Sequence, residues 1–180
     1  MKILGLDISS SVIGWAIIEK KDDSLNLLNY GNIKPLKSSK GNMTERLDDT
    51  FVKIKSLLKD ETFDDIAVEQ YANKFSKGRS SARTIIVLSS FNEVVCLACY
   101  QETNITPHKI SPATIRKNVG KHFGEKIVSK EDAFQLIVKK FNNFQITKNR
   151  NLNIRKEHYD ESDAICVAIS HLLEGRKCQK

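Results

Sequence analysis

Cysteine and proline are both scarce in this sequence, and no leader segment is recognisable at its start. The 180 residues include four cysteines, three prolines and eight glycines. Four irregularly spaced cysteines do not form a disulfide framework, and the Cys96–Cys99 pair lies in an apolar stretch without a second ligand pair at zinc-finger spacing. We therefore expect reduced thiols and a cytoplasmic protein, since MKILGLDISS does not have the pattern of a signal peptide.

Long apolar runs are also missing from the sequence. None approaches the roughly 20 residues that span a bilayer, so we expect no membrane contact. The apolar fraction of 40% and the charged fraction of 28% exclude a disordered chain and a collagen-like repeat. At this length, residues 1–180 are expected to form one domain.

Acidic residues are outnumbered, with 22 Asp and Glu against 29 Lys and Arg, which gives a net charge of +7. The excess is concentrated in residues 72–83, 108–126 and 139–156, which together hold 15 of the 29 basic residues and one of the 22 acids. Segregation of this kind favours a phosphate-binding surface over scattered solvated charges.

The spacing of apolar residues predicts an α/β fold. It predicts strands over 2–8, 14–20, 25–33, 64–70 and 104–110, and helices over 44–59, 84–100 and 160–174, with further helices capped by Ser111 and Ser129. We expect a mixed five-stranded sheet flanked by helices, in which the first three strands are antiparallel and the later ones parallel. The helix over 84–100 is so broadly apolar that it would be a core helix or one shared with a second subunit.

Four carboxylates occupy positions from which they could converge. Asp7 ends the first predicted strand and Glu69 ends the fourth, while Asp160 and Asp163 share one face at the start of the last helix. Clustered carboxylates repel one another unless cations neutralise them, and hard oxygen ligands suit Mg²⁺ or Mn²⁺. Two such ions per site could activate a water molecule and stabilise the leaving oxygen in phosphodiester hydrolysis.

Three segments that contain these acids, and one further segment, carry a family resemblance. ILGLDISSSVIGWAIIE resembles the opening motif of the RuvC-like branch of the RNase H superfamily, IAVEQ its second acidic motif, and YDESDAICVAISHLL its closing helix. PHKISPATIRKNVGKH is similar to the segment before the third acid of bacterial RuvC Holliday-junction resolvases. The resemblance implies an RNase H-like fold, a homodimer, two Mg²⁺ or Mn²⁺ ions per active site, and paired symmetric nicking of four-way DNA junctions.

The resemblance also assigns roles to residues. Asp7, Glu69, Asp160 and Asp163 would be the catalytic, metal-binding acids, and the helix over 84–100 would form the dimer. His158 lies near a position where some relatives use histidine, although Asp160 fills that place here. Tyr71 and Phe75 are candidate aromatic wedges that unstack a junction base. DNA-binding roles fall to Lys74, Lys77, Arg79, Arg83, Lys109, Arg116, Lys117 and Lys130.

The sequence departs from the family in the DISSS loop, which lacks glycine, and in the longer basic segment 142–157. These departures suggest a divergent, phage-encoded relative that acts on forks as well as four-way junctions. Three alternatives stay open: a ribonuclease for RNA–DNA hybrids on the same fold, a non-catalytic protein that binds branched DNA, and a nucleotide-binding module related to actin-like ATPases. The last would need a second copy of the fold, for which the chain is too short.

Overall fold

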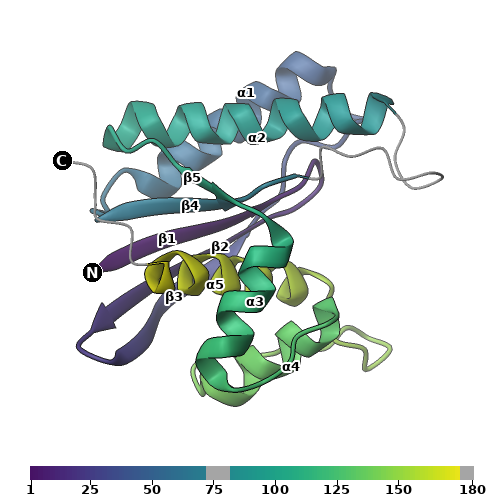
Figure 1. Ribbon diagram of the computed structural model, residues 1–180. Helices are drawn as coiled ribbons and strands as arrows, with labels where there is room; N and C mark the ends of the chain where they lie inside the picture. Colours follow the sequence, from purple (N-terminus) through teal and green to yellow (C-terminus); the bar gives the residue numbers. More distant parts are fainter. Residues whose placement is uncertain (72–81, 175–180) are drawn as a thin grey trace.

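A mixed five-stranded sheet lies at the centre of the computed structural model, which describes residues 1–71 and 82–174 (Figure 1). Its order is β3-β2-β1-β4-β5, with β1–β3 antiparallel and β4 and β5 parallel to β1. The predicted mixed sheet is therefore confirmed. The strands are β1 (Lys2–Ile8), β2 (Ile13–Lys21), β3 (Ser24–Ile33), β4 (Asp65–Glu69) and β5 (His108–Ile110).

Helices cover both faces of the sheet. Figure 1 shows the two groups of helices on either side of the sheet. The first pair is α1 (Met43–Leu58) and α2 (Ala82–Thr103), and the second group is α3 (Pro112–Phe123), α4 (Lys130–Lys140) and α5 (Glu157–Leu173). Every predicted helix is present, but α5 begins three residues earlier than expected, so Asp160 lies within its first turn.

The last strand is shorter than predicted. We expected a strand over 104–110, whereas β5 begins only at His108. Pro107 has no amide hydrogen to donate to a neighbouring strand, and Asn104 adopts a left-handed backbone conformation with φ 58°. Both features interrupt an extended strand before His108.

Side chains alternate across the sheet and build two separate cores. Leu4 and Leu6 pack into the cluster formed with α1 and α2, whereas Ile3 packs into the cluster formed with α3, α4 and α5. Because alternate residues point to the same face, Gly5 and Asp7 face α5 together with Ile3. The same alternation directs Asp65, Ala67 and Glu69 of β4 toward α5.

Capping residues fix where the helices begin. The side chain of Asn42 accepts a hydrogen bond from the Glu45 amide, as expected for the start of α1. Ser111 and Ser129 cap α3 and α4 in the same way, as predicted. The Ser129 cap makes Lys130 the first residue of α4, at the end of the helix that faces α5.

Helix α2 leaves much of its apolar surface uncovered. Phe91, Val95 and Cys99 are buried, whereas Ile86 and Leu97 are 64% and 49% exposed. By length and mean hydropathy alone, α2 is long and apolar enough to cross a membrane, which differs from our expectation that no segment is. Of its most apolar stretch, 28% is buried within the chain. An exposed apolar helix face of this kind is typical of a surface that contacts another molecule.

Two glycines let α5 approach the sheet closely. A Cβ atom at Gly5 would lie 2.3 Å from the carbonyl oxygen of Ala164, and one at Gly14 would lie 2.1 Å from that of Asp160. Both contacts are with helix backbone, which cannot move aside as a flexible side chain can. Glycine at these two strand positions therefore sets the distance between the sheet and α5.

Replacement of Gly14 by alanine should push the start of α5 away from β2. We expect Gly14→Ala to lower the free energy of unfolding by about 3 kcal/mol, since a new methyl group would overlap the backbone of Asp160. Chemical denaturation followed by circular dichroism measures the effect. Asn26→Ala, on an exposed position of β3, is the control and should change stability by less than about 0.5 kcal/mol. Equal stability of the two variants would contradict the close packing.

Candidate active site

The carboxyl ends of β1 and β4 bring two of the predicted acids together. The parallel register pairs Leu6 with Val68, so the next residues, Asp7 and Glu69, leave the sheet at the same level. Both side chains point to the face that α5 covers. The sequence prediction that these two acids would meet at one end of the sheet agrees with this register.

Helix α5 adds the other two acids. Asp160 and Asp163 lie one turn apart on the side of the helix that faces the end of β1. Gly14 pairs with Asp7 across the β1–β2 ladder, and its backbone lies directly under the carbonyl group of Asp160. The close helix–sheet contact at Gly14 therefore also brings the α5 acids near Asp7.

One ammonium group holds three of the four carboxylates. The Nζ atom of Lys130 lies 2.6 Å from Asp163 Oδ2, 2.9 Å from Asp160 Oδ1 and 3.9 Å from Asp7 Oδ2. Burial lowers the pKa of Lys130, but the neighbouring carboxylates, Asp163 above all, outweigh burial and raise its pKa overall. The ammonium thus stays charged and partly neutralises the acidic cluster, which we define as Asp7, Glu69, Asp160 and Asp163.

The acidic cluster opens into a cleft of about 180 Å³. Asp7, Glu69, Asp163 and Lys130 line its polar side together with Arg116 from α3. The remaining wall is mostly apolar and comes from Pro112, Ile115, Val119, Ile127, Ala133 and Cys166. The cleft thus combines an apolar wall with several carboxylates and two basic side chains.

Burial and mutual repulsion raise the pKa values of the acids. Burial is the main cause at Asp7, whose pKa is also raised by Glu69, Asp163 and Asp160. Burial and then Asp163 raise the pKa of Glu69 to about 7. The pKa of Asp163 is raised too, again mainly by burial. Raised pKa values of this kind mean that the ionised carboxylates are disfavoured, and that an additional positive charge nearby would stabilise them.

The donor atoms in the cleft suit a hard divalent cation. Burial raises the pKa of the Cys166 thiol, which therefore stays protonated and is a poor metal ligand. The carboxylate oxygens remain as the available ligands, and these are the donors that Mg²⁺ and Mn²⁺ prefer. The cleft therefore fits the metal that the sequence led us to expect, and a bound cation would offset the burial and the repulsion that raise the carboxylate pKa values.

The predicted DNA-binding residues are spread over more than one surface. Arg116 lines the cleft, and Lys117 is exposed beside it on α3. Arg83 is exposed in the first turn of α2. Lys109 lies away from the acidic cluster, because its side chain forms an ion pair with Glu93 of α2, on the other face of the sheet.

Of the two candidate aromatic wedges, Tyr71 lies within the described part of the chain. Tyr71 follows β4 and is half-buried, and its hydroxyl group forms a hydrogen bond of 3.1 Å with Ser89 of α2. Phe75 lies outside the described residues. So do the predicted DNA-binding residues Lys74, Lys77 and Arg79.

His158 is engaged in a buried network rather than among the acids. Its Nδ1 atom lies 2.7 Å from Glu161 Oε2, and its Nε2 atom accepts a hydrogen bond from the Thr147 amide. Glu161 also accepts a hydrogen bond from Asn32 of β3. The network ties the segment before α5 to the first turn of that helix, and we did not predict it, since neither periodicity nor motif marks Asn32 or Thr147.

Comparisons with known proteins agree on one family. The family described as crossover junction endodeoxyribonuclease RuvC matches residues 3–171. The RuvC protein of Aliarcobacter butzleri is 28% identical over 181 residues, covering 95% of this chain and 97% of that protein. The RuvC protein of Ehrlichia ruminantium is 29% identical over 180 residues, covering 96% of each.

Solved structures support the same fold. Thermus thermophilus RuvC in complex with a Holliday junction substrate superposes with a TM-score of 0.72 at 14% identity, covering 98% of this chain and 96% of that one. The yeast mitochondrial Holliday junction resolvase gives a TM-score of 0.64 at 14% identity, with 93% of this chain and 76% of that one covered. The RNase H-like fold expected from the sequence is thereby confirmed, and the chain belongs to the RuvC family of crossover junction endodeoxyribonucleases.

Proposed function

We propose that this chain is a metal-dependent endonuclease that resolves four-way DNA junctions by paired symmetric nicks. Its acidic cluster carries the proposal, because three of its acids line one cleft with a lysine and an arginine, and the same lysine pairs with the fourth acid, Asp160. In this proposal Asp7, Glu69, Asp160 and Asp163 hold two Mg²⁺ or Mn²⁺ ions. The ions would supply an activated water molecule and stabilise the leaving oxygen of the scissile phosphodiester.

The residues of the cleft have different roles in this proposal. Asp7 is close enough to the other three acids that each raises its pKa, so it is the residue best placed to contact both ions. Arg116 and Lys130 supply positive charge for the scissile phosphate. The ammonium of Lys130 and a metal ion would compete for the same oxygens, so Lys130 would turn toward the phosphate when the ions bind.

A basic groove beside the acidic cluster supports DNA binding. The groove starts at Asp160 and is bordered by the segment that precedes α5. Four basic side chains line it, and phosphate contacts from lysine and arginine dominate the affinity of most DNA-binding proteins. The four are Lys34, Arg150, Arg155 and Lys156.

The proposed enzyme works as a homodimer, because paired nicks on a symmetric junction need two active sites. Ile86, Leu97 and Tyr100 form one exposed stripe along α2 and are 64%, 49% and 50% exposed. A second copy of this stripe is the partner whose chemistry matches it. We further infer one domain over residues 1–180, action in the bacterial cytoplasm, and activity on forks as well as four-way junctions. A phage origin of the chain stays a prediction.

Loss of Asp7 should separate cleavage from binding. We expect Asp7→Asn to reduce nicking of a synthetic four-way junction by at least about 1,000-fold, since the variant loses the proposed ligand of both metal ions. Junction affinity in a gel-shift assay should remain within about threefold of the original protein, because phosphate contacts dominate affinity.

Asp48→Asn, on an exposed position of α1, is the matched control and should cleave normally. An Asp7→Asn protein that still cuts the junction would refute the role of the acidic cluster. The substrate panel separates the alternatives: cleavage of only an RNA–DNA hybrid would indicate a ribonuclease, and binding without cleavage in Mg²⁺ or Mn²⁺ would indicate a non-catalytic protein.

Cleavage should depend jointly on pH and on Mg²⁺ concentration. The pKa of Glu69 is raised to about 7, and a protonated carboxyl group does not bind a cation. At limiting Mg²⁺ the initial rate should therefore fall as the pH drops below about 7, and saturating Mg²⁺ should move this fall to lower pH. A pH midpoint that does not respond to Mg²⁺ would speak against Glu69 as a metal ligand.

The raised pKa of Glu69 also predicts that this side chain lowers the stability of the metal-free protein. Its pKa is higher in the folded chain than its ordinary value, so without metal the folded state loses stability as the pH rises through 7. Glu69→Gln should thus raise the free energy of unfolding at pH 8 in EDTA by about 2 kcal/mol. It should also abolish cleavage. Lower stability of the variant under these conditions would contradict the electrostatic account.

A charge on the exposed stripe of α2 should break the proposed dimer. We expect Leu97→Glu to run as a monomer in size-exclusion chromatography with light scattering, at concentrations where the original protein is dimeric. Val52→Glu is the control, because Val52 is 57% exposed on α1, outside the stripe. A dimer that survives Leu97→Glu, or an original protein that is monomeric, would contradict this interface.

A further inference from the structure

A second cluster of chemically active side chains lies at the other end of the sheet. Asp65 is the first residue of β4, four residues before Glu69, and His108 is the first residue of β5. His171 lies near the end of α5, about two turns beyond Asp163. Four residues of strand span about 13 Å, so this cluster is separate from the acidic cluster although both face the same helix.

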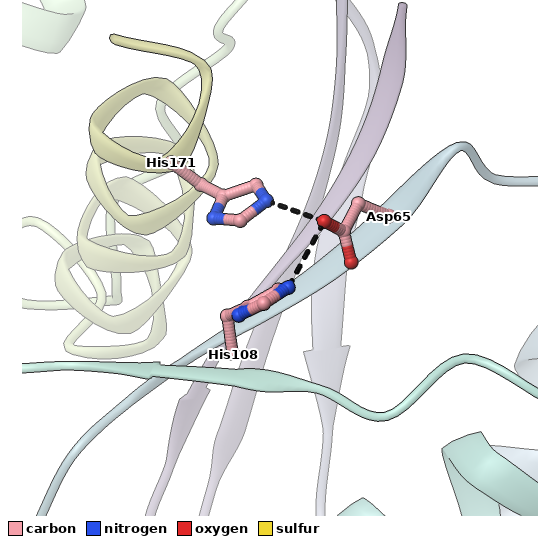
Figure 2. Close-up of side chains that lie close together, drawn as sticks. All are labelled: Asp65, His108 and His171. Atoms are coloured by element: carbon pink, nitrogen blue, oxygen red, sulfur yellow. Dashed lines mark hydrogen bonds and ion pairs between the residues drawn. The ribbon is translucent and has the colours of Figure 1, made fainter. Parts of the chain in front are cut away.

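Three donor atoms from different elements converge there, as Figure 2 shows. Oδ2 of Asp65 lies 2.8 Å from His171 Nε2 and 3.2 Å from His108 Nε2. The three potential ligand atoms all lie within 4.8 Å of one another. The two imidazole rings stack with their centroids 4.9 Å apart, and both Nε2 atoms are directed toward the same carboxylate.

Two of the three ligand separations are close to what a tetrahedral metal ion requires. Ligands at about 2.0–2.1 Å from a tetrahedral ion are about 3.3 Å from one another. The two nitrogen–oxygen distances of 2.8 and 3.2 Å would open only slightly to reach that value. Two imidazole nitrogens and one carboxylate oxygen are a donor set that suits Zn²⁺ and related transition metals rather than Mg²⁺.

Burial and access also fit an ion. Asp65 and His171 are buried, whereas the His108 side chain is 29% exposed and borders a pocket of about 250 Å³. That pocket provides an entry path and space for a fourth ligand. Asp64, Asn104 and Thr106 also line it, so oxygen donors or a water molecule could complete the coordination.

His171 has an incomplete set of polar contacts among the described residues. Its Nδ1 atom is buried and has no hydrogen-bond partner in that part of the chain, so the only hydrogen bond of its ring runs through Nε2 to Asp65. A buried imidazole held by one contact is under-satisfied for its cost of burial. An ion bound at Nε2 would strengthen the one polar contact that the ring makes, while Nδ1 would keep no partner among the described residues.

We propose that Asp65, His108 and His171 bind one transition-metal ion of the zinc class, at a site distinct from the acidic cluster. The ion would link the end of α5 to the starts of β4 and β5. It would therefore stabilise the same helix–sheet contact whose opposite end carries Asp160 and Asp163. The proposal concerns metal binding and does not depend on the chain being a nuclease.

The test is binding of Zn²⁺ and Co²⁺ to the full chain, stripped with EDTA and then held in excess Mg²⁺ to fill oxygen-ligand sites. Calorimetry should give one Zn²⁺ per chain, and Co²⁺ should produce the visible absorption of a nitrogen-ligated ion. His108→Ala should weaken Zn²⁺ binding at least tenfold, that is by about 1.4 kcal/mol. Because His108 is only half-buried, this variant should still fold, and its melting temperature without metal checks that it does.

Two further variants make the test decisive. His122→Ala removes an exposed histidine of α3 outside the cluster and should leave Zn²⁺ binding unchanged. Asp163→Asn removes a carboxylate of the acidic cluster and should also leave Zn²⁺ binding unchanged. Absence of Zn²⁺ binding by the original chain would overturn the proposal. So would an affinity that survives His108→Ala and is lost in Asp163→Asn, because that result would assign the ion to the acidic cluster.

Discussion

Repulsion between buried carboxylates is the constraint around which this molecule is arranged. Asp7, Glu69 and Asp163 each have raised pKa values because they are buried close to one another. One ammonium group, that of Lys130, offsets part of this charge at 2.6 Å from Asp163. A fold selected for stability alone would not gather these groups, since each buried charge opposes folding. Their convergence makes sense in a cleft built to take up cations and a phosphate.

The backbone keeps that arrangement in place through close packing of α5 on the sheet. Gly5 and Gly14 allow the helix backbone to approach to distances that no side chain could tolerate. The buried network of His158, Glu161 and Asn32 fixes the first turn of the same helix to β3. At the far end, Asp65 and two histidines tie the helix to β4 and β5. Helix α5 is thus anchored along its length, which fixes the positions of its acids Asp160 and Asp163.

Much of the fold and the position of the acids could be predicted from the sequence. Strand-ending acids such as Asp7 and Glu69 are visible because strands alternate and parallel strands end together. The caps at Ser111 and Ser129 follow from local hydrogen bonding, which a short stretch of sequence encodes. The cluster of Asp65, His108 and His171 escaped prediction, because its members come from three elements whose register only the folded sheet defines. The ion pair of Lys109 with Glu93 also depends on strand alternation, and the DNA-binding role expected for Lys109 stays a prediction.

Anomalous X-ray scattering from Mn²⁺ can show whether the acidic cluster holds two divalent ions, as we propose. Crystals of the full chain grown with Mn²⁺ should contain two anomalous peaks bounded by the four carboxylates of the cluster. The ammonium of Lys130 should be displaced from its present contacts with Asp160 and Asp163. A cluster without Mn²⁺ peaks, in which Lys130 still bridges the acids at saturating metal, would rule out the two-metal site.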